Sequence, residues 1–112
     1  MAKKYKDNII LQKNKISYAN NIYWVFGILV KKNGKISRNE IMKRLLKKNI
    51  ETRPFFLSMN KQKIFKKMNL FNKAKVPNSE YLSKNGFYLP SGLGITNKQI
   101  DFVIKNLLKI IS

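Results

Sequence analysis

The segment IYWVFGILV, residues 22–30, is the longest apolar run in the chain and the stretch that most constrains the fold. Its aromatic and β-branched residues are typical of a strand that is covered on both faces. Gly27, within the run, would let a neighbouring segment approach closely. We therefore predict that this segment is the central strand of a sheet.

The same run argues against a membrane location. It has nine residues, about half of what a membrane-spanning helix needs. The N-terminus also has no apolar signal segment. We therefore expect a cytoplasmic protein with no membrane partner.

A turn and a helix are predicted directly after the strand. Asn33-Gly34 is a turn signal that ends the strand. Ser37 and Glu40 have the spacing of a capping box, which predicts a helix that ends near Asn49. Four apolar residues would lie on one side of this helix: Ile41, Met42, Leu45 and Leu46.

The middle of the chain is less regular. Residues 50–53 have the pattern of a second strand, and residues 61–68 that of a short helix. Residues 69–77 are expected to form a loop. The inward-facing residues of the short helix would be Ile64, Phe65 and Met68.

The last third of the chain predicts two helices around a third strand. Asn78 can cap a helix that continues to residue 85 and is ended by Gly86, and residues 87–89 would form the strand. Thr96 and Gln99 form a second capping box. Six apolar residues then repeat at helical spacing: Ile100, Val103, Ile104, Leu107, Leu108 and Ile111.

These elements predict a small α+β fold, with a sheet of about three strands and helices packed on it. A chain of 112 residues suits one domain, which we expect to span residues 19–112. Residues 1–18 are polar and rich in lysine, with a weak apolar cluster at residues 9–11, and are interpreted as a lead-in segment.

The composition excludes several kinds of chemistry. The chain has no cysteine and no histidine, so it lacks disulfides, thiolate metal ligands, the commonest metal ligand and the usual acid/base side chain. We therefore expect no metal site and no catalytic triad.

The net charge of +19 is the largest departure from an ordinary composition. Such a charge favours contact with nucleic acid, acidic lipid or anionic metabolites. However, the lysines are spread along the chain, and arginine, which makes bidentate contacts to bases and phosphates, occurs only three times. A compositional bias on solvated faces and a basic binding surface are both consistent with this pattern.

One segment, IETRPFFLSMNKQ at residues 50–62, has the character of a functional loop. Arg53 lies directly before Pro54, which disfavours helical geometry at the arginine. The other two arginines, Arg38 and Arg44, fall within the helix predicted after Ser37. Arg53 is therefore the arginine placed where a strand enters a loop, a common position for functional side chains.

Three stretches carry a family resemblance: YWVFGILV at 23–30, SRNEIMKRLLKKNIETRPFF at 37–56 and NSEYLSKNGFYLPSGLGIT at 78–96. In this order and spacing, residues 19–111 resemble the C-terminal domain of the DegT/DnrJ-type sugar aminotransferases, the perosamine-synthase-like group. The resemblance implies the small domain of a fold-type-I aminotransferase. It covers none of the large domain, which in this family binds pyridoxal phosphate through a lysine.

The resemblance also implies a reaction and a site. Family members use pyridoxal phosphate to move an amino group from glutamate to a keto group of a nucleotide-linked sugar, a step in polysaccharide biosynthesis. Arg53 matches the motif arginine and would contact an anionic group or fix the loop; the alternative is a structural arginine bonded to backbone carbonyls. No lysine of the chain lies in the family's lysine motif, so no catalytic or cofactor-binding residue is expected here.

The segment departs from the family pattern at the positions nearest the expected substrate. The family usually has proline where this chain has Ser58 and Lys63, and histidine where it has Asn60. Asn60 keeps a hydrogen-bonding group but loses a titratable one, and is the second substrate-proximal candidate. This pattern suggests relaxed functional demand on a domain that still folds.

The leading hypothesis is therefore a truncated aminotransferase that is inactive alone. Its partner would be a separately encoded large domain that completes it in trans, or a second copy in a homodimer. A second hypothesis is a small basic protein that binds nucleic acid without sequence preference, and a third is a folded interaction module with exposed apolar residues. A helix-turn-helix around residues 37–48 is disfavoured, because residues 50–54 carry a strand pattern and a proline where a recognition helix should begin.

Overall fold

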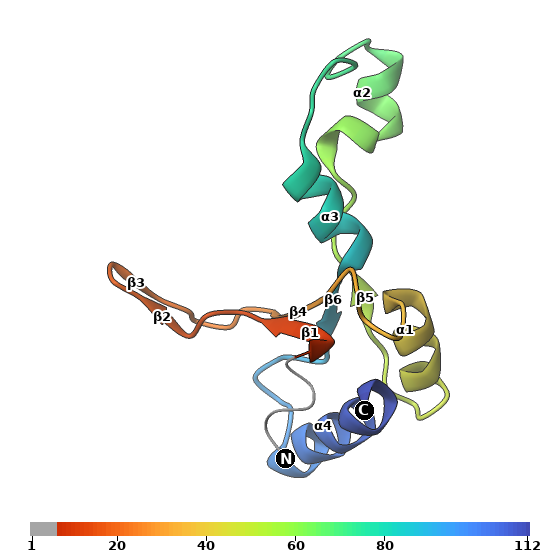
Figure 1. Ribbon diagram of the computed structural model, residues 1–112. Coiled ribbons are helices and arrows are strands. Elements are labelled where there is room, and N and C mark those ends of the chain that lie inside the picture. Colours follow the sequence, from red (N-terminus) through yellow and green to blue (C-terminus); the bar gives the residue numbers. More distant parts are fainter. Residues whose placement is uncertain (1–6) are drawn as a thin grey trace.

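The predicted central strand lies inside a four-stranded antiparallel sheet. The computed structural model describes residues 7–112. Its sheet has the order β1 (Ile9–Leu11), β4 (Phe26–Val30), β6 (Gly86–Leu89) and β5 (Arg53–Pro54) (Figure 1). Because β4 is hydrogen-bonded to β1 and β6, the prediction of a central strand is confirmed. The α+β fold with a small sheet is also confirmed.

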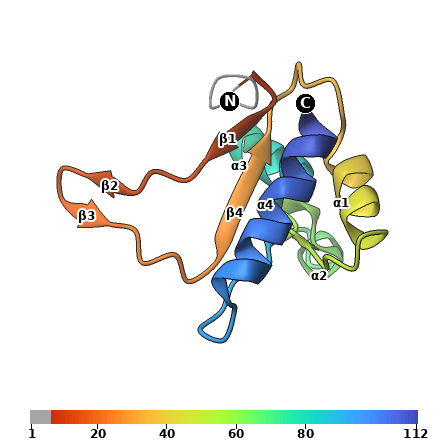
Figure 2. The same ribbon diagram turned by 90° about the horizontal axis from the view of Figure 1, so that it is seen from below.

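The other elements surround or extend from this sheet. Two short strands, β2 and β3, pair as an arm that reaches away from the body (Figures 1 and 2). A 3-10 turn, η2, precedes α2. Their bounds are β2 Lys15–Ile16, β3 Ala19–Asn20, α1 Arg38–Leu46, η2 Met59–Lys61, α2 Lys63–Lys67, α3 Pro77–Asn85 and α4 Asn97–Ile111.

Helices α1 and α4 cover one face of the sheet and enclose the core (Figure 2). Both begin at the predicted caps: Ser37 Oγ accepts the Glu40 N–H, and Thr96 forms a complete capping box with Gln99. The buried side chains of the core are Ile9, Ile28, Val30, Ile41, Leu45, Ile50, Phe87, Leu89, Val103, Leu107 and Ile111. The core therefore lies between the sheet and these two helices.

The central strand is shorter than the sequence suggests. The extended strand begins at Phe26, whereas Ile22 and Trp24 are exposed. Tyr23 has φ +50°, and its N–H is bonded to Asn21 Oδ1. An asparagine side chain that bonds the backbone two residues on favours a turn. This turn separates the first half of the apolar run from the strand.

The second predicted strand is displaced by the end of α1. Asn49 adopts φ +58°, and the Ile50 N–H donates to the Leu45 carbonyl, which closes the helix in the manner of a Schellman motif. Ile50 then fills the core, and β5 comprises Arg53–Pro54 instead of residues 50–53. Pro54 is tolerated there because β5 is an edge strand.

Part of the predicted lead-in belongs to the sheet. Residues 9–11 form β1, which gives the sheet four strands instead of about three. Asn8, just before β1, is buried; its Nδ2 donates to the Ile111 carbonyl at 2.7 Å, and its Oδ1 accepts the Lys35 N–H. These bonds join the start of β1 to the end of α4 and to the segment before α1, which no local pattern could indicate.

Two further expectations about the helices are wrong. No side chain of α2 is buried, so Ile64, Phe65 and Met68 do not face a core. The cap of α3 is Val76, and Pro77 occupies the first helical turn; Asn78 therefore lies inside the helix. A proline at this position needs no N–H partner, which allows the helix to begin earlier than predicted.

The other face of the sheet is organised by Phe55. Its ring stacks on Tyr88 with centroids 4.6 Å apart, and its N–H donates to the Gly86 carbonyl. A Cβ built at Gly27 would lie 2.9 Å from Phe55 Cζ, and one at Gly86 would overlap the same ring. The close neighbour expected at Gly27 is thus Phe55, and both glycines leave room for it.

This packing makes Gly86 intolerant of a side chain. We expect Gly86→Ala to lower the free energy of unfolding by about 2 kcal/mol, because the new methyl group overlaps the Phe55 ring. Gly94→Ala is the matched control: nothing lies within 4 Å of its built Cβ, so its effect should stay within about 0.5 kcal/mol. Urea unfolding measures both. If Gly86→Ala costs as much in a Phe55→Ala background as in the native one, the ring is not the cause.

Candidate functional site

Arg53 stands on the sheet face that carries Phe55. It pairs with Tyr88 across β5 and β6, and its guanidinium lies 3.0 Å from a Glu51 oxygen. The side chain is 79% exposed. An open groove of about 350 Å³ runs beside it, lined also by Thr52 and Ser91. A guanidinium in such a groove is accessible to a phosphate or carboxylate, which it can bind bidentately.

The arginine that bonds to backbone carbonyls is Arg38, whereas Arg53 bonds to the Glu51 side chain. Arg38 Nη1 donates to the Ser83 carbonyl at 2.6 Å and to the Gly86 carbonyl at 3.4 Å. These contacts are partly buried and join the start of α1 to the end of α3. Arg38 therefore holds two elements together, whereas the bond of Arg53 to Glu51 is exposed on both sides.

The two arginines should respond differently to truncation. We expect Arg38→Ala to cost about 2 kcal/mol, since two carbonyls lose a charged donor. Arg53→Ala should change the free energy of unfolding by less than about 0.5 kcal/mol, because exposed ion pairs contribute little. Thermal or urea unfolding of the two variants provides the comparison. A loss at Arg53 equal to that at Arg38 would show that Arg53 is structural.

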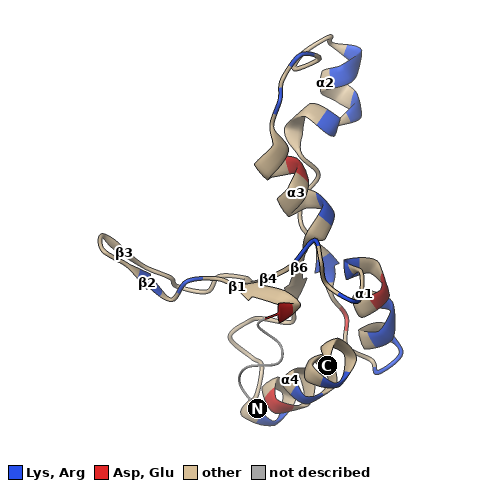
Figure 3. Cartoon of the chain, viewed as in Figure 1, with Lys and Arg blue, Asp and Glu red and all other residues tan. Residues whose placement is uncertain are grey.

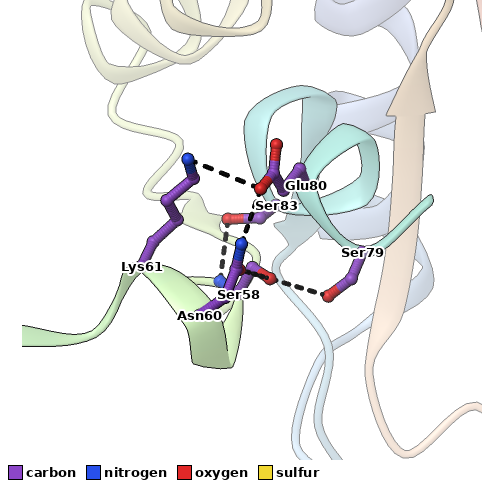
Figure 4. Close-up of polar contacts among 6 residues, drawn as sticks. All are labelled: Ser58, Asn60, Lys61, Ser79, Glu80 and Ser83. Atoms are coloured by element: carbon purple, nitrogen blue, oxygen red, sulfur yellow. Dashed lines mark hydrogen bonds and ion pairs between the residues drawn. The ribbon is translucent and has the colours of Figure 1, made fainter. Parts of the chain in front are cut away.

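Asn60 belongs to a different cluster, between η2 and α3 (Figure 4). Its Nδ2 donates to Glu80 Oε1 at 2.6 Å, and its Oδ1 accepts the Ser58 hydroxyl at 2.6 Å. Because that hydroxyl proton is used, the 3.0 Å contact between the Ser58 and Ser79 hydroxyls is donated by Ser79. Lys61 Nζ completes the cluster, 3.4 Å from Glu80 Oε1.

Ser58 is the buried centre of this cluster. It is 5% exposed, and its N–H donates to the Ser83 hydroxyl at 3.3 Å. A proline at this position has no N–H and could not make that bond. Ser58 and Asn60 thus bond to each other and to α3. Two of the three departures from the family pattern therefore form one polar contact, and no buried polar side-chain atom is left unpaired in the described part of the chain.

The cluster lowers the pKa of Glu80 below its usual 4.5, chiefly through the Asn60 hydrogen bond and also through the Lys61 charge. Since the folded protein binds the proton less tightly than the unfolded chain, this contribution to stability is complete above pH 4.5. It is lost as the pH falls through the folded-state pKa.

Removing the asparagine amide should restore the ordinary titration. In Asn60→Ala, we expect the pKa of the Glu80 carboxyl to rise toward 4.5, as followed by NMR. Glu40 is the matched control, because its pKa is lowered first by the Arg44 hydrogen bond, outside this cluster. Equal movement of both carboxyls, or none at Glu80, would contradict the assignment.

The two predicted site residues, Arg53 and Asn60, contact different parts of the structure. The groove beside Arg53 does not include Asn60, which faces α3. Sequence reasoning missed the residues that Asn60 contacts and the structural role of Arg38. The available signal was the spacing of Ser79, Glu80 and Ser83, which places them on one side of a helix. That spacing does not identify the segment they face.

The described residues do not fit pyridoxal phosphate or a metal by themselves. None of the described lysines is buried, although a lysine that forms a Schiff base is usually activated by desolvation. Within residues 7–112, no three potential metal ligands among His, Cys, Asp and Glu lie together. No helix in the same range is both long and apolar enough to cross a bilayer.

The chain was compared with family models, with curated proteins and with solved structures. A model of the DegT/DnrJ/EryC1/StrS aminotransferase family matches residues 3–108. A search of curated proteins gave no match.

Solved structures share the fold at low sequence identity. The E. coli GDP-4-keto-6-deoxy-D-mannose-3-dehydratase with hydrated PLP is 23% identical, with a TM-score of 0.73 over 93% of this chain and 27% of its own. The putative sugar aminotransferase Spr1654 of Streptococcus pneumoniae is 16% identical, with a TM-score of 0.80 over 95% and 28%. Helicobacter pylori PseC, an aminotransferase of pseudoaminic acid biosynthesis, is 17% identical, with a TM-score of 0.67 over 78% and 23%. The chain therefore spans less than a third of these proteins.

Proposed function

The chain belongs to the DegT/DnrJ/EryC1/StrS aminotransferase family, and from this membership we propose that it corresponds to the small domain of a nucleotide-sugar aminotransferase and transfers no amino group alone. One observation carries the proposal: the similarity covers 93% of this chain but 27% of the dehydratase chain. The absence of a buried lysine among the described residues agrees with it.

In this proposal the domain contributes binding and positioning. Arg53, with its guanidinium exposed beside a groove, would hold an anionic group of the sugar-nucleotide. Asn60 would act indirectly, because its side chain is engaged by Ser58 and Glu80. It orients the segment that follows Arg53 and would not contact the substrate through these atoms.

A large domain supplied in trans would complete the site. Exposed aromatic residues support such a partner: Trp24 and Phe56 lie on the surface, and Phe56 packs only edge-on against Tyr88. A folded partner could bury them, since aromatic residues are enriched at protein interfaces. A homodimer is the other assembly that could cover these side chains.

Non-specific nucleic-acid binding is the alternative function, supported by the net charge of +19. Lysine and arginine occur on several helices and loops instead of along one element (Figure 3). α1 leads into β5, so no recognition helix follows it. Salt-dependent retention on DNA without sequence preference would favour this function over the small-domain role.

The proposal predicts how the purified protein treats pyridoxal phosphate. We expect no aldimine absorbance that survives desalting and no amino transfer from glutamate to a keto-sugar nucleotide. Borohydride reduction followed by peptide mapping should show weak labelling spread over many surface lysines, because none of the described lysines is buried.

The same chain unfolded in urea, in which every lysine is accessible, provides the control for non-specific labelling. A single lysine labelled in stoichiometric amount, or measurable amino transfer, would contradict the proposed inactivity.

A further inference from the structure

Residues 57–76 form a lobe that projects from the body. It contains η2, α2 and the loop that leads to α3, and it extends beyond α3, away from the sheet (Figure 1). Apart from Ser58, none of its residues is buried. The lobe therefore has no core of its own, and its surface chemistry decides what it can contact.

The charge of the lobe has one sign. Residues 57–76 contain six lysines and no aspartate, glutamate or arginine. Lys61 is paired with Glu80 of α3; among the described residues, the other five have no ion pair. Figure 3 shows basic residues along α2 and the following loop. These five lysines are Lys63, Lys66, Lys67, Lys73 and Lys75.

Large apolar side chains are exposed between these lysines. Ile64 is 55% and Met68 57% exposed, and Phe71 packs edge-on against Phe65 with ring centroids 5.4 Å apart. The further exposed residues of this kind are Leu57, Met59 and Leu70. A basic surface interleaved with aliphatic and aromatic groups is the pattern of an interfacial membrane segment.

The charge and the side-chain types of the lobe distinguish between the molecules that could bind it. A second copy is disfavoured, because two lobes of the same strong positive charge would repel. Nucleic acid would neutralise the lysines, and Phe71 could stack on a base, but the more numerous exposed isoleucine, leucine and methionine side chains could not. An anionic bilayer surface provides acidic headgroups above an apolar layer and so accommodates both kinds of side chain.

We propose that this lobe binds the surface of membranes that contain anionic lipids. Its lysines contact the headgroups, and Ile64, Met68 and Leu70 enter the boundary of the acyl layer. This inference requires that the lobe is not covered by the large domain of the proposed function, which would lie against the same segment at residues 58–63. It replaces the expectation of no membrane partner with peripheral, non-spanning attachment.

Vesicle partitioning tests the proposal with the full chain. The protein should sediment with phosphatidylcholine vesicles that contain phosphatidylglycerol, but not with phosphatidylcholine alone. The triple variant Lys63→Gln, Lys66→Gln, Lys67→Gln should lower the partition coefficient roughly 100-fold, because each lysine near an anionic surface contributes about a factor of five. The control Lys43→Gln, Lys47→Gln, Lys48→Gln removes equal charge from exposed positions outside the lobe.

A second set of variants tests the apolar contribution. Ile64→Ser, Met68→Ser, Leu70→Ser should lower partitioning at least about tenfold, since lost burial weakens insertion. The control Ile22→Ser, Trp24→Ser, Leu93→Ser changes residues elsewhere that are more exposed than those of the lobe, and it should alter partitioning less than about twofold. All substituted side chains are exposed, and circular dichroism verifies that each variant is folded.

A single engineered cysteine locates the contact, because the chain has none of its own. An environment-sensitive dye on Asn72→Cys should shift to the blue on anionic vesicles, and the same dye on Asn33→Cys should not. Three results would overturn the proposal: no binding to anionic vesicles, equal losses in the lobe and control charge variants, or lobe variants that weaken binding to poly(U) but not to vesicles.

Discussion

The contact between Phe55 and the glycines of the sheet is the constraint on which the arrangement of the remaining parts depends. β5 has two residues and pairs only with β6, so its ladder alone gives a weak attachment. The Phe55 ring adds apolar contact over Gly27 and Gly86, and stacking on Tyr88 fixes its plane. The segment between β5 and α3, which contains η2 and α2, begins at Phe55. The ring thereby anchors the backbone that carries Arg53 before it and the lobe after it.

The segment between β5 and α3 has a second attachment, which is polar and lies at the base of the lobe. Ser58 and Asn60 bond to α3 through Ser79, Glu80 and Ser83. Ser58 and Asn60 hold the segment through side-chain hydrogen bonds at two positions where the resemblance implies proline and histidine. Lys63, the third departure, has no ion pair among the described residues. Relaxed functional demand therefore stays a prediction.

The sequence predicts those features that arise from local chemistry. The Ser37 cap of α1, the capping box of α4, the α+β class and the interior position of β4 follow from cap spacing and apolar pattern. The errors arise where distant residues decide. β1 is joined to α4 through Asn8, and the Ile50 N–H bonds to the Leu45 carbonyl at the end of α1 instead of to a neighbouring strand. Arg38 reaches carbonyls more than forty residues away, so its structural role had no local signal.

The buried residues divide the structure into a body with its own core and two parts without one. Among the described residues, the core draws on β1, β4, β6, α1 and α4, together with Ile50. The β2–β3 arm and the lobe contribute nothing to it, and both leave large apolar side chains in solvent. Their ordering entropy is offset by few internal contacts. Binding can therefore act on the arm and the lobe without disturbing the sheet, because the body already encloses the apolar surface that stabilises it.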